Sequence, residues 1–418
     1  MRRGLLGLLT DVRPLQVSAD YRRLWFGSTV SQLGQQMTQV TIAIQVYALT
    51  RSTFSVGLVG LFALFPLIAF GLYGGAFADA LDRRKLALVS SGGLWVLSIA
   101  LAAQALLDVR SVWVLYGVVA LQSSCYAVNS PTRSAILPRL VPGELLPSAN
   151  ALNMAAFNLG FTAGPLLGAV AITVGGYQLA YGTDVVTFTA ALYSLFRLPP
   201  IPPIVAEGEV AGRPGLRSVL EGIRFLRAAP NIRMTFLLDM CAMVLAQPRS
   251  LFPAVAGIFF AGGVRTVGVL QASPAIGSLI AFLLSGWVGR IRRQGLAIAV
   301  AVGLYGSAVA AFGFSRILGV GIVLLALSGA ADMVSAAYRS TILQVATPDS
   351  LRGRLQGVFT VVVAGGPRTG DFLMGSAASL FTPTLALAGG GVACVLGVLA
   401  LGVKERRFLG YDAAHPQP

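Results

Sequence analysis

Charged residues are rare and costly inside the long apolar stretches of this 418-residue chain, and five of them carry the functional prediction. They are four acids and one arginine: Asp184, Asp239, Asp332, Asp371 and Arg368. Carboxylates in such places take up and release protons, and a guanidinium holds anionic groups. We therefore predict a substrate or proton pathway that includes Asp239, Asp332, Arg368 and Asp371. Asp184 lies near the end of its stretch, so we expect a structural or interfacial role there.

Arg368 and Asp371 belong to the segment VVVAGGPRTGDFLMGS, residues 361 to 376. Their spacing of three places both on one face if the segment is helical. Two interpretations stay open. In one, the two charges neutralise each other beside a helix break at residues 365 to 367. In the other, both face a cavity, where Arg368 holds a substrate anion and Asp371 takes up a proton.

The composition indicates that these residues sit in a membrane protein. The chain is 56% hydrophobic and only 11% charged, with a mean hydropathy of +0.77. A bilayer-spanning helix needs about 20 apolar residues, and twelve stretches qualify, which predicts an all-α membrane protein with twelve transmembrane helices. The predicted spans are 24–49, 54–78, 86–107, 112–137, 146–173, 178–198, 233–257, 264–289, 295–314, 317–343, 354–380 and 383–403.

The net charge of +15, from 31 Lys and Arg against 16 Asp and Glu, is explained by membrane topology. If both termini are cytoplasmic, most of these cations fall at cytoplasmic ends of spans, as the positive-inside rule requires. A nucleic-acid partner is therefore not expected. We predict a multi-pass protein of the cell (inner or plasma) membrane, in contact with the lipid bilayer and monomeric.

An internal repeat divides the spans six and six. Residues 132–152 align without gaps to residues 338–358 at a constant offset of 206, which pairs Arg133 with Arg339. Both arginines lie close to the predicted inner surface, so we expect inner gate or anchor roles for them. Parallel repeats of this kind are typical of secondary transporters with a site between two bundles.

This division predicts five segments along the chain. They are a cytoplasmic extension (1–22), an N-terminal six-helix bundle (23–198), a cytoplasmic linker with an amphipathic helix (199–230), a C-terminal six-helix bundle (231–403) and a cytoplasmic tail (404–418).

The connection GAFADALDRRKL, residues 75 to 86, resembles the loop signature of the major facilitator superfamily. Gly75, Asp79, Arg83 and Arg84 match the signature, whereas Ala80 stands where it favours a cation. The resemblance implies the twelve-helix major facilitator fold. It also implies a gating loop whose acid binds the start of the eleventh span, as an anion at a helix N-terminus.

A second motif of this superfamily is the sequence GxxxGPxxG, associated with antiporters. It is matched by Gly160, Gly164, Pro165 and Gly168 in NLGFTAGPLLGAVA. Small residues at this spacing also simply let two helices approach closely. LVPGELLPSANAL and DMCAMVLAQPRSLFPA extend the resemblance to the superfamily branch that contains the bacterial enterobactin exporter.

Relatives in this branch often carry an acid in the first span, where this chain has glutamines. Gln32, Gln35, Gln36 and Gln39 lie on adjoining turns, and amides there hydrogen-bond a polar substrate or water. We include them in the candidate pathway.

The resulting prediction is a secondary active transporter that exports a siderophore-like or hydrophobic drug-like small molecule by proton-coupled antiport. The alternatives are a lipid or lysophospholipid transporter, an uncoupled facilitator of the same fold, and a sensor without transport. The sequence GxxxxGK[ST] of ATP-driven pumps does not occur. Three scattered cysteines and one histidine in the tail form no catalytic or metal pattern: Cys125, Cys241, Cys394 and His415. We expect no enzyme activity, no cofactor and no metal.

Overall fold

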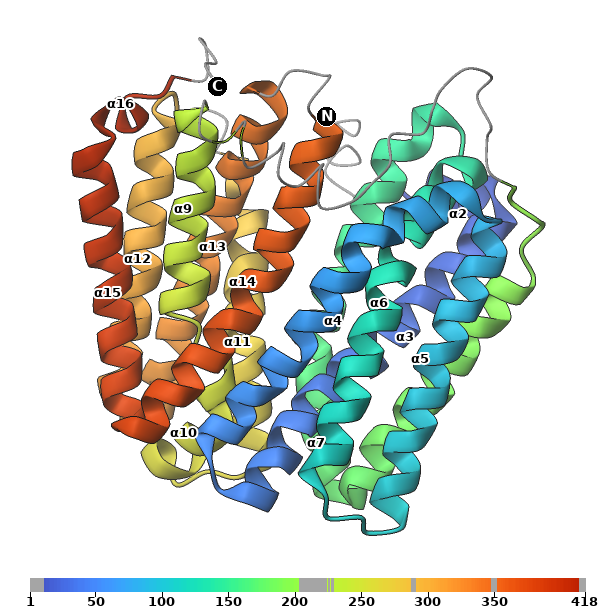
Figure 1. The fold of residues 1–418 in the computed structure, drawn as a ribbon, viewed down its shortest axis with the longest axis horizontal. Coiled ribbons are helices and arrows are strands. Elements are labelled where there is room, and N and C mark those ends of the chain that lie inside the picture. Colours follow the sequence, from blue (N-terminus) through green and yellow to red (C-terminus); the bar gives the residue numbers. More distant parts are fainter. Residues whose placement is uncertain are drawn as a thin grey trace, which may run out of the picture. The chain divides into compact units, whose positions relative to one another are not determined.

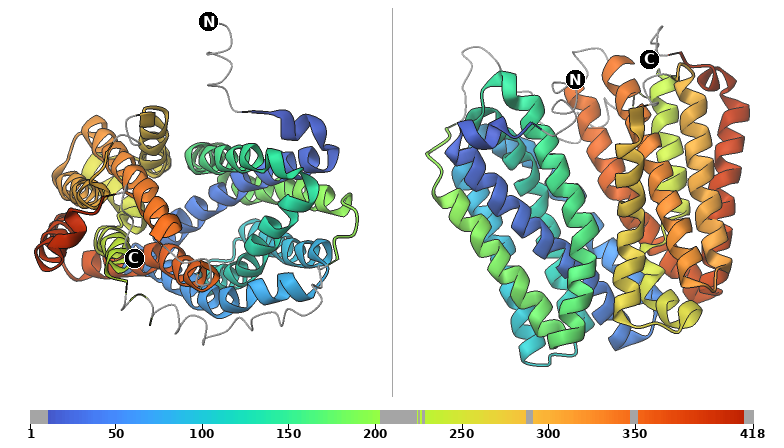
Figure 2. Two further views of the ribbon diagram at one scale, coloured as in Figure 1. Left: turned by 90° about the horizontal axis from the view of Figure 1, so that it is seen from above. Right: turned by 180° about the vertical axis from the view of Figure 1, so that it is seen from behind.

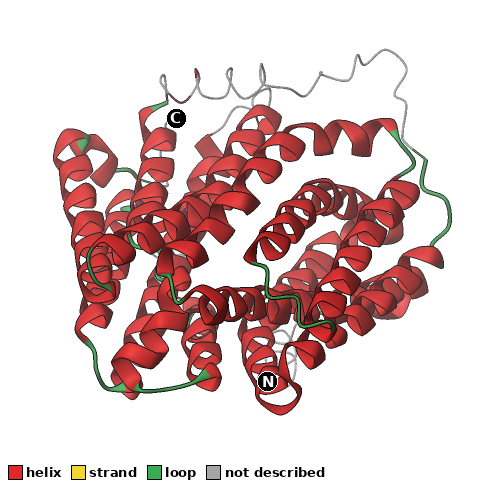
Figure 3. Cartoon of the chain, turned by 60° about the horizontal axis from the view of Figure 1, so that its bottom comes forward, coloured by secondary structure: helices red, strands yellow, loops and turns green. Residues whose placement is uncertain are grey.

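The computed structural model describes residues 11–202, 224, 226, 229–286, 291–346 and 352–412, without the side chains of 72–80 and 352–361. All regular structure in these ranges is helical (Figure 3). The amphipathic helix predicted around residues 216–227 and His415 fall largely or wholly outside the described residues, so those predictions stay untested.

The helices follow one another along the chain, and the longest interval between two of them is residues 197–229, between α7 and α9 (Figure 1). Their bounds are α2 Arg13–Val17, α3 Ala19–Thr50, α4 Thr53–Ala80, α5 Arg83–Leu106, α6 Val112–Leu140, η1 Gly143–Leu145, α7 Leu146–Phe196, α9 Pro230–Leu245, η2 Arg249–Leu251, α10 Phe252–Phe260, α11 Val264–Leu283, α12 Gln294–Phe314, α13 Leu318–Ala346, α14 Arg352–Leu380, α15 Pro383–Lys404 and α16 Arg406–Leu409.

Nine segments within the described residues are long and apolar enough to cross a membrane, which makes this an all-helical, multi-pass membrane protein. One of them, Gly143–Phe196, contains two predicted spans. The predicted first and eleventh spans are the helices α3 and α14, of 32 and 29 residues. The twelve predicted spans fit this arrangement.

The helix α7 holds the predicted fifth and sixth spans without a loop between them. Its 51 residues are interrupted at Gly175 and Gly176, where Gly176 has a φ of +67°. A left-handed conformation costs glycine little because it lacks a Cβ atom. The two glycines can therefore turn the chain within two residues. The sequence-based boundary between residues 173 and 178 is confirmed.

The predicted seventh span, 233–257, is not one continuous helix. The helix α9 ends at Leu245, and α10 begins only at Phe252 after the short helix η2. Pro248 lies in the interruption, where it has no N–H to continue the helical hydrogen bonds. The carbonyl of Ala246 is satisfied instead by the hydroxyl of Tyr305 at 3.3 Å.

The chain forms two compact units, one of Met1–Ile42 with Ala69–Pro214 and one of Ala43–Ile68 with Gly215–Pro418. Figure 2 shows the helices from two further sides. In the first unit the buried hydroxyl of Tyr21 donates to the carbonyl of Ala149 at 3.0 Å, which joins α3 to α7. The internal repeat is visible in the helix bounds, because both ends of α6 and α13 differ by the predicted offset of 206.

Candidate functional site

Arg339 of α13 lies between two carboxylates in the second unit. Its Nη1 forms an ion pair with Asp239 Oδ1 of α9, and its Nη2 lies 3.3 Å from Asp332 Oδ1. The side chains of Asp239 and Arg339 are 6% and 12% exposed, whereas Asp332 is 36% exposed. Asp332 and Arg339 are seven residues apart, hence two turns apart on one face of α13. We call these three residues the Arg339 cluster.

The Arg339 cluster carries one positive charge and two negative charges when all three groups are ionised. A shared guanidinium offsets part of the desolvation cost of the two carboxylates. One proton bound to the cluster would make it neutral, and Asp332 is its most accessible acid. Carboxylates in such surroundings are chemically suited to taking up and releasing a proton.

Arg133 of α6 occupies the corresponding position in the first unit, with different partners. Its Nη1 donates to Ser28 Oγ of α3 at 2.6 Å, and its Nη2 donates to Ser91 Oγ of α5 at 3.2 Å. Asn129 reinforces this network because its Nδ2 donates to Ser91 Oγ at 2.7 Å. Within the described ranges, no carboxylate forms an ion pair with Arg133.

Arg368 and Asp371 of α14 each contact the backbone of another residue. Arg368 Nη1 donates to the carbonyl of Ala364 at 2.6 Å, and Asp371 Oδ1 accepts from the amide of Ser250 at 3.2 Å. The predicted helix break at residues 365–367 is absent, because α14 is helical through Pro367. The roles predicted for the two charges stay untested.

This part of α14 packs closely against α4 within the second unit. A Cβ atom on Gly57 would lie 2.9 Å from the carbonyl oxygen of Asp371, and one on Gly375 would lie 2.9 Å from Gly57 Cα. Thr53 Oγ1 donates to the carbonyl of Gly375 at 3.1 Å. The backbones of α4 and α14 therefore approach so closely that only glycine fits at these positions.

The glycines of the antiporter-type motif pack against the glutamine-bearing helix α3. A Cβ atom on Gly160 would lie 2.7 Å from Gln32 Cγ, and one on Gly164 would meet Gln36 Cβ. Gln36 is buried and Gln39 is exposed, while Gln32 and Gln35 are partly buried. The geometry thus shows the close helix packing that small residues at this spacing allow. Its link to antiport and the pathway role of the glutamines stay predictions.

The basic pair of the gating-loop signature binds backbone carbonyls of two helices in the first unit, one of them at the C-terminus of α7. Arg83 Nη1 donates to the carbonyl of Ala135 at 3.1 Å, and Arg84 Nη2 donates to that of Phe196 at 2.6 Å. Cations at such carbonyls also interact favourably with the negative end of the helix dipole. The side chain of Asp79 is not among those described, and neither are the surroundings of Gly75.

Asp184 is only 1% exposed, so it is buried within the first unit, and its predicted structural or interfacial role stays a prediction. Ser98 Oγ of α5 donates to its Oδ2 at 2.7 Å. The three cysteines are free thiols, and the residues with described side chains hold no group of three metal-ligating residues. Sequence reasoning missed Ser28, Ser91, Asn129 and Ser98, because single hydroxyls and amides in helices carry no pattern that separates them from ordinary packing residues.

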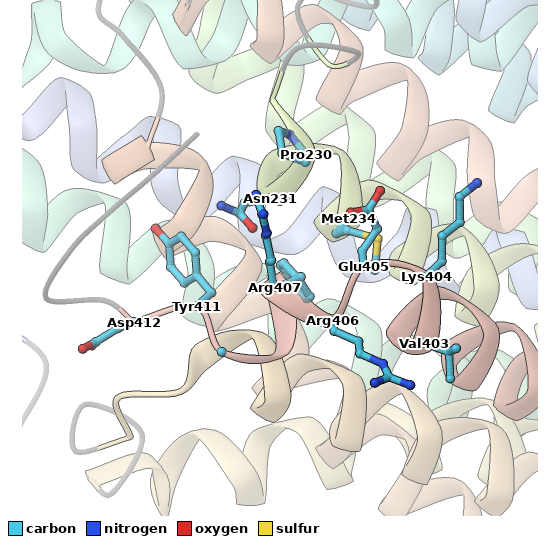
Figure 4. Close-up of a pocket in the computed structure, with 12 residues that line it drawn as sticks. Pro230, Asn231, Met234, Val403, Lys404, Glu405, Arg406, Arg407, Tyr411 and Asp412 are labelled. Atoms are coloured by element: carbon cyan, nitrogen blue, oxygen red, sulfur yellow. The ribbon is translucent and has the colours of Figure 1, made fainter.

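A pocket of about 650 Å³ lies at the ends of α9, α15 and α16 (Figure 4). The view shows Arg407 and Tyr411 beside Asn231 at the first turn of α9. Arg233 and Glu405 form an ion pair of 2.8 Å there, and partial burial raises the pKa of Tyr411. The pocket involves helix ends and none of the predicted pathway residues.

Buried ionisable groups on long apolar helices, repeated at a fixed offset, define a polytopic membrane protein with a polar interior of the kind that transporters use. Residues 10–412 match the family of transmembrane secretion effectors, and the chain belongs to this family, within the major facilitator superfamily.

Curated relatives agree with this assignment. The chain is 29% identical over 404 residues to the enterobactin exporter EntS of Shigella boydii serotype 18, covering 96% of each protein. It has the same identity and coverage with the enterobactin exporter EntS of Escherichia coli O157:H7.

Solved transporters share the fold at much lower identity. A transporter of the POT family, in complex with 5-aminolevulinic acid, has a TM-score of 0.75 and 11% identity, covering 94% of this chain and 97% of that one. A mutant of the nucleoside transporter NupG has a TM-score of 0.72 and 12% identity, covering 92% and 99%. A bacterial homologue of the lysosomal transporter Spinster has a TM-score of 0.69 and 15% identity, covering 96% and 97%.

Proposed function

We propose that this protein is a secondary active transporter, not an enzyme, that exports a siderophore-like or hydrophobic small molecule by alternating access coupled to proton uptake. Export and the substrate class rest on the similarity to enterobactin exporters across 96% of the chain. Proton coupling is supported by one observation above all, the Arg339 cluster of two carboxylates around one guanidinium.

In the proposed cycle, Asp332 takes up the coupling proton. Asp332 is the more exposed of the two acids, and Asp239 keeps Arg339 paired after Asp332 is neutralised. The local charge then changes by one unit without leaving a buried guanidinium alone, which is the costly alternative. Arg368 and Asp371 remain a second candidate exchange site, in which a substrate anion and a proton compete.

The experiment is uptake of enterobactin into proteoliposomes under an imposed pH gradient. Asp332→Asn should abolish gradient-driven accumulation while leaving exchange without a gradient intact. Asp371→Asn tests the second candidate site, and unchanged accumulation would remove Asp371 from coupling. Asp108→Asn is the matched control, since Asp108 is exposed and pairs with Arg110 at a surface connection. Equilibration of enterobactin across the membrane that an imposed pH gradient does not change would instead support an uncoupled facilitator, which the four glutamines of α3 also favour.

We further propose that both termini are cytoplasmic, in the cell membrane, and that the functional unit is a monomer of two six-helix bundles, residues 23–198 and 231–403. Lys404, Arg406 and Arg407 follow the last span closely, as cytoplasmic ends do. A membrane-impermeant thiol reagent tests the topology. A cysteine placed at exposed Asp108 should react from outside intact cells, and one at Arg407 only after the membrane is opened.

A further inference from the structure

The fourth span of each half carries an arginine at the same position of the repeat, Arg133 in α6 and Arg339 in α13. Within the described residues, only Arg339 is paired with carboxylates. Since α6 and α13 share their bounds at an offset of 206, Tyr126 corresponds to Asp332. The first span of each half also differs, because Arg133 contacts Ser28 of α3 where Arg339 contacts Asp239 of α9. In the first unit, the offset thus places a phenol where the second unit has Asp332, and the contact to the first span is made by a hydroxyl instead of a carboxylate.

An inward-facing guanidinium without a counter-ion is unfavourable, since its charge loses hydration and gains only dipoles. Arg133 Nε, like Arg339 Nε, is buried and has no hydrogen-bond partner in the described part of the chain, so it is the lack of a paired carboxylate there that sets Arg133 apart. The residue as a whole is half-buried. Among the described side chains, none supplies a negative charge that pairs with the Arg133 guanidinium.

The hydroxyl groups around Arg133 have hydrogens left to donate. Ser91 Oγ already accepts two hydrogen bonds, from Asn129 Nδ2 at 2.7 Å and from Arg133 Nη2 at 3.2 Å. A serine oxygen has two lone pairs and one hydrogen, so the Ser91 hydroxyl is still able to donate one hydrogen bond. Ser28 Oγ likewise accepts from Arg133 at 2.6 Å. A guanidinium N–H together with hydroxyl donors is a combination that suits an oxyanion.

We propose that Arg133, positioned by Ser28 and Ser91, binds an anionic oxygen group of the transported molecule, such as a carboxylate or a phosphate. The inference rests on the proposed export function and narrows its substrate class to molecules with an acidic group. The two arginines of the repeat then differ in role, since Arg339 is occupied by carboxylates of the protein itself.

The test uses benzoate and benzamide, which have nearly the same shape and differ in charge. Their binding to the purified full chain in detergent is measured by saturation-transfer NMR. The wild type should prefer benzoate by about tenfold, the effect of one charge-assisted hydrogen-bonded contact. Arg133→Gln should lose this preference, and Arg110→Gln, at an exposed surface arginine, should keep it.

Tyr126→Asp separates charge from folding. It gives Arg133 the carboxylate that Arg339 has in Asp332, so the guanidinium stays while its charge is satisfied internally. Benzoate preference should fall about tenfold, as in Arg133→Gln. If the wild type shows no preference for benzoate, or if folded Tyr126→Asp keeps it, the inference is overturned.

Transport measurements distinguish this inference from the proposed function. Export of neutral molecules, with no benzoate preference in the purified chain, would overturn the anion site and leave export standing. Benzoate preference at Arg133 in a chain that exports nothing would overturn the proposed function and retain the site only as an anion-binding one.

Discussion

Arg133 and Arg339 occupy equivalent positions in two copies of one repeat, yet their surroundings are chemically different. Arg339 lies between Asp239 and Asp332, and Arg133 lies between the hydroxyls of Ser28 and Ser91. Position in the repeat thus determines where the charge is, and a few neighbouring side chains determine what it does. In the second unit, Arg339 is paired with carboxylates of the protein itself. In the first unit, Arg133 is left to bind the anionic group of the proposed substrate.

The largest effect on stability is expected when each of the two arginines is replaced by methionine. Arg339→Met leaves Asp239 and Asp332 without their cation, and removal of one member of a buried charge group costs about 3–5 kcal/mol. Arg133→Met leaves no charge behind and loses only the hydrogen bonds to Ser28 and Ser91, so its stability should fall by about 1–2 kcal/mol. The measurement is thermal unfolding of both variants in the same detergent. Equal losses would mean that the two arginines are equivalent structural anchors.

Neutralising the two carboxylates that Arg339→Met leaves unpaired checks this reasoning. Adding Asp239→Asn and Asp332→Asn to Arg339→Met removes the orphaned carboxylates and should recover much of the lost stability. A triple variant as unstable as the single one would assign the loss to packing of the arginine side chain.

A smaller effect is expected from glycines at the close helix contacts of the two units. A Cβ atom on Gly329 of α13 would collide with the backbone of Pro274 in α11, whereas one on Gly160 of α7 meets the flexible side chain of Gln32. Gly329→Ala should cost about 1–3 kcal/mol through overpacking, and Gly160→Ala less than about 1 kcal/mol. Gly182→Ala is the control, since open space surrounds that position. Similar unfolding temperatures for all three would contradict the contrast.

Ser91→Ala should have a still smaller effect. It removes the acceptor of Arg133 Nη2 and one of the two acceptors of Asn129, whose Nδ2 also donates to Ser90 Oγ at 2.8 Å. Loss of such a hydrogen bond costs about 1 kcal/mol, measured again by thermal unfolding. Because Ser91 positions Arg133, benzoate affinity should fall in the same variant. A stability loss without an affinity change would restrict Ser91 to structural support.

The smallest effect concerns an arginine whose carboxylate partner is at the surface. Hydrogen bonds from the side chain and backbone of Arg13 lower the pKa of Asp11 well below its ordinary value of 3.8. Since the lowered pKa belongs to the folded state, the contact stabilises above about pH 4 and is lost as the pH falls through the folded pKa. Asp11→Asn should therefore lower the unfolding temperature slightly at pH 7 and not at strongly acidic pH. A deficit that is independent of pH would exclude the carboxylate as its cause.

Hydropathy and charge placement predict the fold class because bilayer thickness fixes the length of an apolar helix. The repeat is also readable, and α6 and α13 reproduce its offset of 206. Hydropathy windows did not reveal the interruption after Leu245. One missing N–H at Pro248 changes the hydrogen bonds and hardly changes mean hydropathy.

The candidate site was predictable only where its residues share one helix. Asp332 and Arg339 lie two turns apart on α13, a spacing that sequence reveals. Asp239 reaches Arg339 from another helix, and Ser28 and Ser91 reach Arg133 from two others, so these contacts depend on packing that local spacing does not encode. Close spacing on one helix also does not by itself predict the contacts. Arg368 and Asp371 lie three residues apart on α14, yet Arg368 donates to the carbonyl of Ala364 and Asp371 accepts from the amide of Ser250.

The glycine pair at residues 175 and 176 has a practical consequence for work on intact cells. Because α7 turns there without a loop, this edge of the protein offers almost no extended chain to a protease, an antibody or an inserted epitope tag. The connection at residues 107–111 between α5 and α6 is longer and carries the exposed Asp108 and Arg110. A reporter placed in that connection should be tolerated, whereas one placed between Gly175 and Gly176 should block assembly of the helix pair.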